Sequence, residues 1–283
     1  AIHVYNICKA AREDGIKVLI GGTAGDDVFS GYRRHQALRI ELLFEKTPLF
    51  LRILFKKILS KFNQKNNFVR KLNKLTANIE KTKEYRLMGY FSWINENTLK
   101  NLFLVKNNYN CYSYFEKLNK SIEKETSDLN RMLFWEINTF LVDHNLNYTD
   151  KLSMANGVEV RVPFLDIELV DFSTKIPPKY KLNQNETKYL LKKVAEKYLP
   201  KEVVYRSKSG FAAPVREWIL NEMDFIIDDY LSESSIKKRG IFDYKKISKL
   251  ISDNKKGVID ASYSIWALLA IESWMRQFYD LNK

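Results

Sequence analysis

"VLIGGTAGDDVFSGYRRH", residues 18–35, is the stretch of sequence that decides the fold. Residues 17–20 predict a short apolar strand of the kind that is buried in a parallel sheet. A loose helical pattern over residues 2–14 precedes the strand, and Gly15 ends that helix. A helix, a strand and a glycine-rich loop in this order are the repeating unit of α/β folds. Such folds bind ligands at the carboxyl end of the strand, where this loop lies.

The loop after the strand is rich in glycine, which lets backbone N–H groups approach a ligand closely. It contains neither a GxxxxGK[ST] nor a GxGxxG pattern, and a plain tight turn would explain it equally well. Asp26 and Asp27 follow, and their carboxylates could hold a metal ion or cap the next helix. The glycines in question are Gly21, Gly22 and Gly25.

Composition points to an ordinary globular protein. The 283 residues are 45% hydrophobic and 29% charged, enough to bury a sizeable core. Cys8 and Cys111 are far apart and the three histidines are scattered, so we expect neither a disulfide framework nor a zinc site. A reducing cytoplasm is the expected compartment. We find no signal peptide, and the apolar run 263–274 is too short to span a bilayer. Because the chain begins with Ala, we expect a fragment.

The net charge of +13 raises the question of an anionic partner. Residues 48–86 contain 11 Lys and Arg against two Glu, and "PLFLRILFKKILSKF" (48–62) predicts an amphipathic helix. Such a helix could lie on an anionic membrane surface or bind nucleic acid. We expect the commoner arrangement, in which its Leu, Ile and Phe pack on the core and its lysines stay in water.

The second half of the chain holds three further candidate segments. Residues 129–155 predict one or two helices that Gly157 ends, followed by an extended segment and helices over 167–175 and 187–198. In "TDKLSMANGVEVRVPFLD" (149–166), Asp150 and Lys151 are expected to open a helix. Arg161 and Asp166 bracket a rigid apolar turn and could pair or hold a polar ligand, although Asp166 is also a natural N-cap.

Two lysines could bind an anion. Lys188 falls in the first turn of the helix predicted over 187–198, where the helix dipole already presents positive charge. A cation is unfavourable there unless an anion faces it, and a phosphate would serve, although chance placement explains the lysine as well. Lys208 lies in "YRSKSGF" (205–211), which is either an anion site or a surface turn.

Taken together and in this order, four segments resemble one family. "VLIGGTAGDDVFSGY", "DKLSMANGVEVRVPFLD", "ETKYLLKK" and "RSKSGFAAPVREW" are similar to "VLSGDGGDELFGGY", "RMSMAHSLEVRVPFLD", "GETKYLLR" and "RPKSGFGVPLAEW" of the synthetase domain of glutamine-hydrolysing asparagine synthetases. The resemblance covers most of residues 1–35 and 130–220. It implies an α/β ATP-pyrophosphatase domain, of the adenine nucleotide α-hydrolase-like kind, of which this chain holds a mostly helical part with few strands. We expect residues 1–35 to be the α/β nucleotide-binding end and 36–283 the mainly helical part.

The resemblance also implies an activity. Enzymes of this family use ATP and Mg²⁺ to activate a carboxylate as an acyl-adenylate, release pyrophosphate, and amidate the carboxylate with ammonia from glutamine. The implied reaction is aspartate to asparagine in the cytoplasm, with small-molecule substrates, no nucleic acid, and a homodimer as a compatible assembly. Lysines and Mg²⁺ stabilise the polyphosphate.

Residue roles carry over only where the motifs match. Gly21 and Gly22 would contact the nucleotide through their backbone, and Lys188 would face the phosphates or the tetrahedral intermediate. The remaining matching positions have catalytic or structural roles; they are Asp26, Asp150, Arg161, Asp166 and Lys208.

Two departures from the family pattern matter. The pyrophosphate-binding SGGxDS loop and the glutaminase domain are absent, so we expect this chain alone to be inactive. Thr23 stands where the family carries Glu or Asp, and its hydroxyl cannot act as a base near neutral pH. The acceptor could therefore be another carboxylate, such as a sugar acid of surface polysaccharide synthesis, or the chain could be a non-catalytic homologue.

Overall fold

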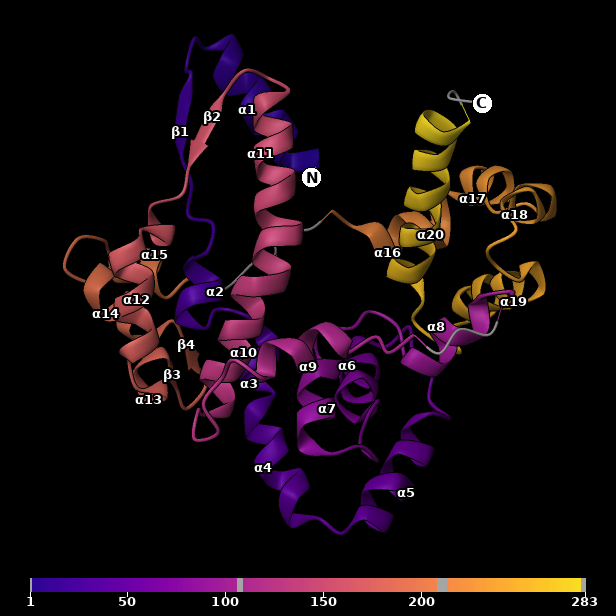
Figure 1. Ribbon diagram of the computed structural model, residues 1–283, viewed down its shortest axis with the longest axis horizontal. Helices are drawn as coiled ribbons and strands as arrows, with labels where there is room; N and C mark the ends of the chain where they lie inside the picture. Colours follow the sequence, from indigo (N-terminus) through magenta and orange to yellow (C-terminus); the bar gives the residue numbers. More distant parts are fainter. Residues whose placement is uncertain (1, 106–108, 208–212, 281–283) are drawn as a thin grey trace. The chain divides into compact units, whose positions relative to one another are not determined.

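The computed structural model describes residues 2–105, 109–207 and 213–280 of the chain. The structure is mostly helical with few strands, as the resemblance implied (Figure 1). The chain divides into two compact units. Unit 1 comprises Ala1–Leu43 with Tyr114–Ala213, and unit 2 comprises Phe44–Ser113 with Pro214–Lys283. The functional division at residue 35 stays a prediction.

Unit 1 contains all four strands of the described chain and the helices around them. The chain passes out of it within α4 and returns at the start of α9. Its elements are α1 (Ile2–Glu13), β1 (Val18–Ile20), α2 (Gly25–Phe29), α3 (Arg33–Gln36), α4 (Leu38–Lys46), α9 (Ser113–Asn119), α10 (Asp128–Glu136), a π-helical stretch (Ile137–Leu146), α11 (Asn147–Met154), β2 (Glu159–Arg161), a 3₁₀ turn (Pro163–Leu165), α12 (Ile167–Lys175), α13 (Pro178–Lys181), β3 (Leu182–Asn183), β4 (Glu186–Thr187), α14 (Tyr189–Ala195) and α15 (Lys201–Val204).

The parallel pair β1–β2 brings the first two sequence motifs together. Leu19 lies opposite Val160, and the Gly21 N–H donates to the carbonyl oxygen of Arg161 at 2.8 Å. Because the strands are parallel, the glycine loop and the "VPFLD" segment leave the same edge of the sheet. The predicted strand is confirmed, but its expected burial is wrong. Ile20 is 78% exposed, because the described sheet has only two strands and does not cover this side chain.

A long helical run forms the back of unit 1. Helix α10, the π-helical stretch and α11 follow one another without a break, as residues 129–155 predicted (Figure 1). Asp150 and Lys151 lie inside this run and do not open a helix, because the chain is already helical at Leu146. Gly157 then adopts a φ of +63°, the left-handed conformation that ends helices.

The core of unit 1 anchors the helix that follows the glycine loop. Ala24, Val28 and Phe29 of this segment pack with Leu141 of the π-helical stretch and Ile176 after α12. Side chains from the 3₁₀ turn, α12 and α14 cover this cluster, among them Phe164, Leu169, Leu190 and Leu191. Helix α2 is therefore held from several sides, and the loop before it has a fixed base.

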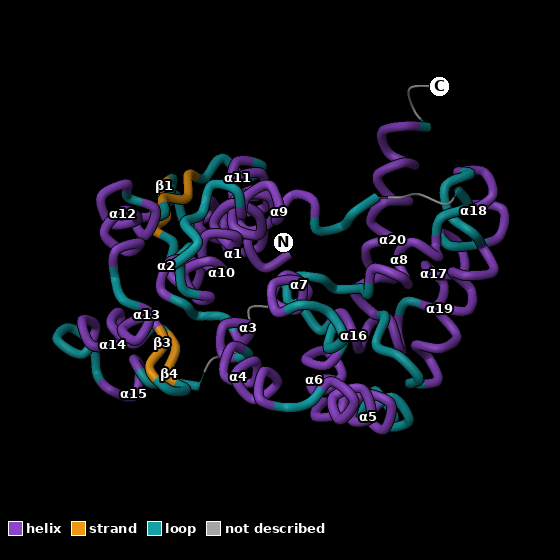
Figure 2. Tube along the Cα trace, turned by 60° about the horizontal axis from the view of Figure 1, so that its bottom comes forward, coloured by secondary structure: helices purple, strands orange, loops and turns teal. Residues whose placement is uncertain are grey.

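All the regular elements in the described part of unit 2 are helices, joined by loops (Figure 2). Its elements are α5 (Leu49–Leu59), α6 (Asn67–Thr76), α7 (Lys83–Gly89), α8 (Glu96–Leu102), α16 (Val215–Glu217), a π-helical turn (Trp218–Glu222), α17 (Asp224–Tyr230), α18 (Glu233–Arg239), α19 (Tyr244–Lys256), α20 (Ser262–Trp274) and a closing π-helical turn (Met275–Tyr279).

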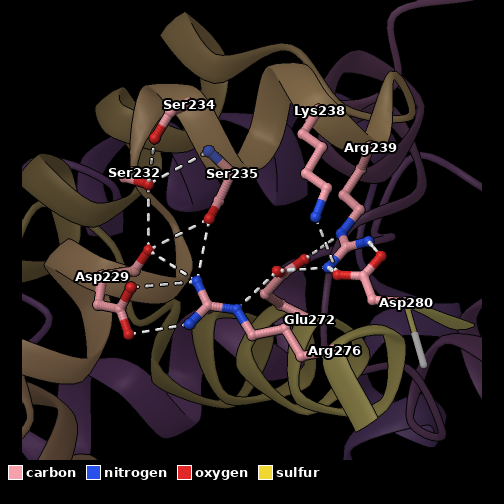
Figure 3. A network of polar contacts seen from close by, with 9 residues as sticks. All are labelled: Asp229, Ser232, Ser234, Ser235, Lys238, Arg239, Glu272, Arg276 and Asp280. Carbon is pink, nitrogen blue, oxygen red and sulfur yellow. Dashed lines mark hydrogen bonds and ion pairs between the residues drawn. The ribbon is translucent and has the colours of Figure 1, made fainter. Parts of the chain in front are cut away.

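In unit 2, a network of hydrogen bonds and ion pairs links α17, α18 and α20 with Arg276 and Asp280 (Figure 3). Arg239 of α18 donates two hydrogen bonds to Glu272 of α20 and two to Asp280, at 2.7–3.0 Å. Arg276 also donates to Glu272, and it donates to Asp229 of α17. Hydrogen-bonded pairs of this geometry stabilise the arginine cation and the carboxylate anion. The hydrogen bonds that Asp280 accepts from Arg239 and Lys238 accordingly lower the pKa of its carboxyl.

Helix α5 contradicts the sequence-based expectation. Its large apolar side chains face solvent, and Phe50 is 68% exposed, while Leu59 is the only residue of the helix that is buried. Periodicity finds the two faces of a helix, but it does not say which face packs on the protein. No helix in the described ranges combines the length and the apolar composition that crossing a membrane requires.

Candidate active site

An ion pair joins the first and third sequence motifs in unit 1. The Lys188 Nζ lies 2.9 Å from Asp26 Oδ1, and both side chains are partly exposed. Asp26 is in the first turn of α2, and Lys188 immediately precedes α14. The helix begins two residues later than predicted, so Lys188 is its N-cap and does not lie in its first turn. The anion that faces this lysine within the described chain is Asp26, where the sequence had suggested a phosphate or chance placement.

Unfavourable backbone conformations gather around this pair. Ala24, Ser30 and Lys188 have φ values of +73°, +66° and +55°, in the left-handed region that residues with a side chain rarely adopt. Each costs about 1 kcal/mol, and such strain concentrates at functional sites, where the surrounding fold holds it. Ala24 and Ser30 flank α2, and Lys188 carries the cation that faces it. The strain therefore marks the same place as the ion pair.

Gly31 fixes the position of Asp26. Its N–H donates to the Asp26 carbonyl oxygen at 2.7 Å. A Cβ at residue 31 would lie 2.7 Å from the Asp26 Cα and closer still to its carboxylate. Glycine is required here by close approach, since no larger residue leaves room for the Asp26 side chain.

The glycines of the loop differ in what surrounds them. A Cβ on Gly21 would lie 3.2 Å from Val160 Cγ1, so β2 explains that glycine. A Cβ on Gly22 would meet nothing within 4 Å, and the φ of Gly22 is not in the left-handed region. Gly22 is exposed and Thr23 half-buried at the end of β1.

Asp27 of α2 belongs to a buried polar network with Tyr32 and Asn145. The Asp27 carboxylate is 1% exposed and accepts a hydrogen bond from the Tyr32 hydroxyl at 3.1 Å. The amide of Asn145 donates to the same hydroxyl at 3.0 Å. Asp27 Oδ1 is buried and has no hydrogen-bond partner within the described ranges. Burial first, and then the nearby charge of Glu136, raise the pKa of the Asp27 carboxyl to about 7.

A fully buried carboxylate stands beside this network. Glu136, on α10, accepts two hydrogen bonds from Arg34, one of them from Nε at 2.6 Å. The Nε2 of His35 lies 3.4 Å from Glu136 Oε2. Burial lowers the pKa of His35, so the imidazole is neutral at physiological pH. The Arg34 guanidinium also lies over the rings of Tyr32 and Phe140, at 4.4 and 4.6 Å from their centroids.

We expect Asp27→Asn to change how stability depends on pH. Below the ordinary pKa of aspartate, folded and unfolded chains both carry the proton, and Asp27 has no effect. As the pH rises, the unfolded chain ionises first, so the free energy of unfolding falls until the pH passes about 7. Between about pH 5.5 and 7.5 this loss amounts to about 2 kcal/mol, and Asn removes it.

The measurement is hydrogen exchange of peptides from α2 and α10 in both proteins across this pH range. His35 acts in the opposite direction, because the unfolded chain gains a proton on it at low pH. The difference in free energy of unfolding between wild type and Asp27→Asn cancels the contribution of His35. Asp171→Asn, on the exposed side of α12, is the matched control. Parallel pH curves for wild type and Asp27→Asn would contradict the raised pKa.

The other predicted residues lie apart from the ion pair. Arg161 is paired with Glu159 on its own strand, at 2.9 Å. Asp166 accepts a hydrogen bond from the Leu169 N–H and caps α12, which confirms its structural alternative. Asp150 is exposed on α11. Lys208 lies outside the described residues.

Sequence reasoning missed Glu136, Tyr32 and Asn145. A signal for Glu136 existed, since it is the single charge in the apolar run "MLFWEINTFLV" (132–142), and a carboxylate there must find a buried partner. Nothing in the sequence shows that this partner is Arg34, 102 residues earlier. Within the described ranges, no three His, Cys, Asp or Glu residues gather as a metal-binding group.

Comparison with known proteins agrees with this geometry. The profile of the family described as "Asparagine synthase" matches residues 1–276, nearly the whole chain and all of the site residues above. The chain belongs to the asparagine synthase family. It therefore shares the family's adenine nucleotide α-hydrolase-like domain, and use of ATP is a property of that family.

Relatives in the asparagine synthase family show how far the likeness extends. "Asparagine synthetase [glutamine-hydrolyzing] 1" of Bacillus subtilis is 29% identical over 97% of this chain and 42% of its own length. A putative asparagine synthetase of Mycobacterium tuberculosis H37Rv is 30% identical over 53% of the chain and 23% of its length. "Amidase chry2" of Gibberella zeae is 25% identical over 38% and 17%. The chain thus spans less than half of these relatives. No solved structure matches significantly.

Proposed function

We propose that the chain forms part of the synthetase site of an ATP-dependent ligase that amidates a carboxylate with ammonia from glutamine. The carboxylate is activated as an acyl-adenylate, and aspartate yields asparagine, AMP and pyrophosphate. The observation that carries the proposal is the Lys188–Asp26 pair, held by strained backbone in the segment that leaves the carboxyl end of β1. That is where α/β folds bind nucleotides.

Gly22 adds an independent argument. Neither its φ nor any neighbouring atom of the described chain requires glycine at this position. A glycine that the fold does not need, in a loop at the end of a strand, is explained by a ligand that approaches the backbone. The backbone N–H groups of such a loop would donate hydrogen bonds to a phosphate or ribose oxygen.

Lys188 would supply positive charge to the polyphosphate. Asp26 holds the Lys188 ammonium in place before the ligand arrives, so that little reorganisation is needed when negative charge develops. Mg²⁺ would be held mainly through phosphate oxygens and water, as is usual for nucleotide-bound magnesium, with at most one or two carboxylates. Among the described residues, Asp26 is a carboxylate that could bind this Mg²⁺. Its ion pair with Lys188 would then have to break.

Thr23 favours a second candidate acceptor. It stands at a position where the family motif carries a carboxylate, and a threonine hydroxyl does not act as a base near neutral pH. A sugar acid or another carboxylate would then replace aspartate.

The deciding experiment uses the complete protein, including any sequence that flanks residues 1–283. Glutamine, Mg-ATP and L-aspartate are supplied, and asparagine and pyrophosphate are measured together. Both products at equal rates would support the aspartate reaction. Glutamine hydrolysis with neither product would support another acceptor, which a panel of carboxylates and the variant Thr23→Glu would then test. Tight ATP binding without turnover of any carboxylate would contradict the proposal.

We expect Gly22→Ala to weaken ATP binding while leaving the fold unchanged. The added methyl group meets no atom of the described chain, so unfolding should be unaffected, but it would obstruct a ligand in van der Waals contact with the backbone. A loss of about 2 kcal/mol, or roughly thirtyfold in the dissociation constant, is expected in titration calorimetry. Lys9→Ala, on the exposed face of α1, is the control. Unchanged affinity would remove Gly22 from the site.

A further inference from the structure

The outer face of helix α5 is apolar, and none of the residues that the structure describes covers it. Phe50, Leu51, Leu54, Phe55 and Ile58 are exposed by 43–68%. Their spacing places them side by side on one face of the helix, which we call the α5 face. Isolated exposed apolar residues are ordinary, but five together on one helix face indicate an interaction surface.

Two polar side chains of α5, Arg52 and Lys56, lie on the opposite side of the helix and are half-buried. Lys56 donates to the carbonyl oxygen of Ala77 at 2.9 Å and pairs with Glu80. The backbone carbonyl oxygen of Leu59, also on this side, accepts a hydrogen bond from the Asn73 side-chain amide. Helix α5 is thus packed with part of its polar side inward, the reverse of what a helix selected only for a soluble surface would show.

The charge of the stretch that contains α5 indicates which kind of partner the α5 face would bind. Residues 46–79 contain nine Lys and Arg and no Asp or Glu. Six of the lysines are exposed: Lys46, Lys57, Lys61, Lys65, Lys71 and Lys74. Phe62 and Phe68 of the same stretch are also exposed, at 55% and 69%. An apolar helix face in a stretch of the chain that carries exposed cations and no anion matches the two layers of an anionic bilayer, acyl chains below and charged headgroups above.

We propose that the α5 face docks the protein on a lipid bilayer rich in anionic headgroups. Phe50, Leu54 and Ile58 enter the boundary between headgroups and acyl chains, and the surrounding lysines contact the phosphates. A second copy of the chain fits less well, because a symmetric contact would bring two sets of exposed lysines against each other. Nucleic acid fits less well too, because three of the five residues of the α5 face are aliphatic and offer no ring for base stacking.

The test is co-sedimentation of the complete protein with sucrose-loaded vesicles. One set is pure phosphatidylcholine and the other contains about one third phosphatidylglycerol. We expect binding to the anionic vesicles only, weakened by added salt. Phe50→Ser combined with Leu54→Ser should lower the partition coefficient roughly tenfold or more. Lys57→Gln combined with Lys61→Gln should lower it roughly thirtyfold and flatten the salt dependence.

Phe225→Ser is the matched control, because Phe225 is 73% exposed on α17 of the same unit and lies outside the basic stretch. It should leave binding unchanged. No binding of the complete protein to anionic vesicles would overturn the proposal, whatever covers the α5 face instead. So would self-association in sedimentation velocity that Phe50→Ser with Leu54→Ser abolishes, or capture by RNA or DNA that the same variant abolishes. None of these readouts requires the proposed ligase activity.

Discussion

Replacing Glu136 with Gln is expected to lower the free energy of unfolding of unit 1 by about 3–5 kcal/mol. The Glu136 carboxylate is fully buried and is the charge partner of Arg34, which donates two hydrogen bonds to it. Without the carboxylate, the largely buried guanidinium loses the charge to which it donates two hydrogen bonds. Breaking one half of a buried pair costs more than the intact pair contributes, because the desolvation of the remaining ion is no longer offset.

Hydrogen exchange of α10 peptides measures this effect locally and does not depend on unit 2. Glu233→Gln, which removes a carboxylate from an exposed pair with Lys237, is the matched control and should change nothing measurable. A second variant distinguishes the contribution of the intact ion pair from the cost of leaving one buried charge unpaired. Arg34→Met combined with Glu136→Met should recover much of the loss, since two apolar side chains leave no buried charge. Equal exchange in Glu136→Gln and Glu233→Gln would show that the pair is not buried in solution.

Local features of the fold could be predicted from the sequence because short-range chemistry fixes them. The strand at 18–20, the helix Ile167–Lys175 and the stop at Gly157 follow from apolar runs and a left-handed glycine. Asp166 caps its helix as an aspartate before an apolar periodic segment should. Each of these depends on residues within one or two turns of each other.

Features that depend on distant residues could not be predicted. The side of α5 that faces solvent is decided by what packs against Lys56 and Leu59, not by the pattern of α5 itself. The pairing of Arg34 with Glu136 joins residues 102 positions apart. At Lys188 the sequence suggested a facing phosphate or chance placement, and Asp26, 162 positions earlier, was considered as a metal ligand, a helix cap or a catalytic residue, but not as the partner of this lysine. Tertiary structure supplied the partner.

Lys188→Asn is expected to reduce pyrophosphate release by the complete protein about 100- to 1,000-fold, if the proposed function holds. Asn lacks the ammonium group but tolerates the left-handed backbone that residue 188 adopts, with its φ of +55°. The free energy of unfolding should therefore stay the same or rise slightly while turnover is lost. This separation of stability from activity is what a group that acts on the ligand predicts and a structural lysine does not.

The matched control is Gln184→Asn, because Gln184 has a similar φ of +51° in the turn between β3 and β4. It makes the same change to a strained position without touching the ion pair, and activity should be retained. Lys188→Asn combined with Asp26→Asn then decides what Lys188 does. If the lysine only neutralises Asp26, removing both charges restores turnover. If Lys188 contacts the phosphates, the double variant stays as inactive as Lys188→Asn, because the charge that the transition state needs is still missing.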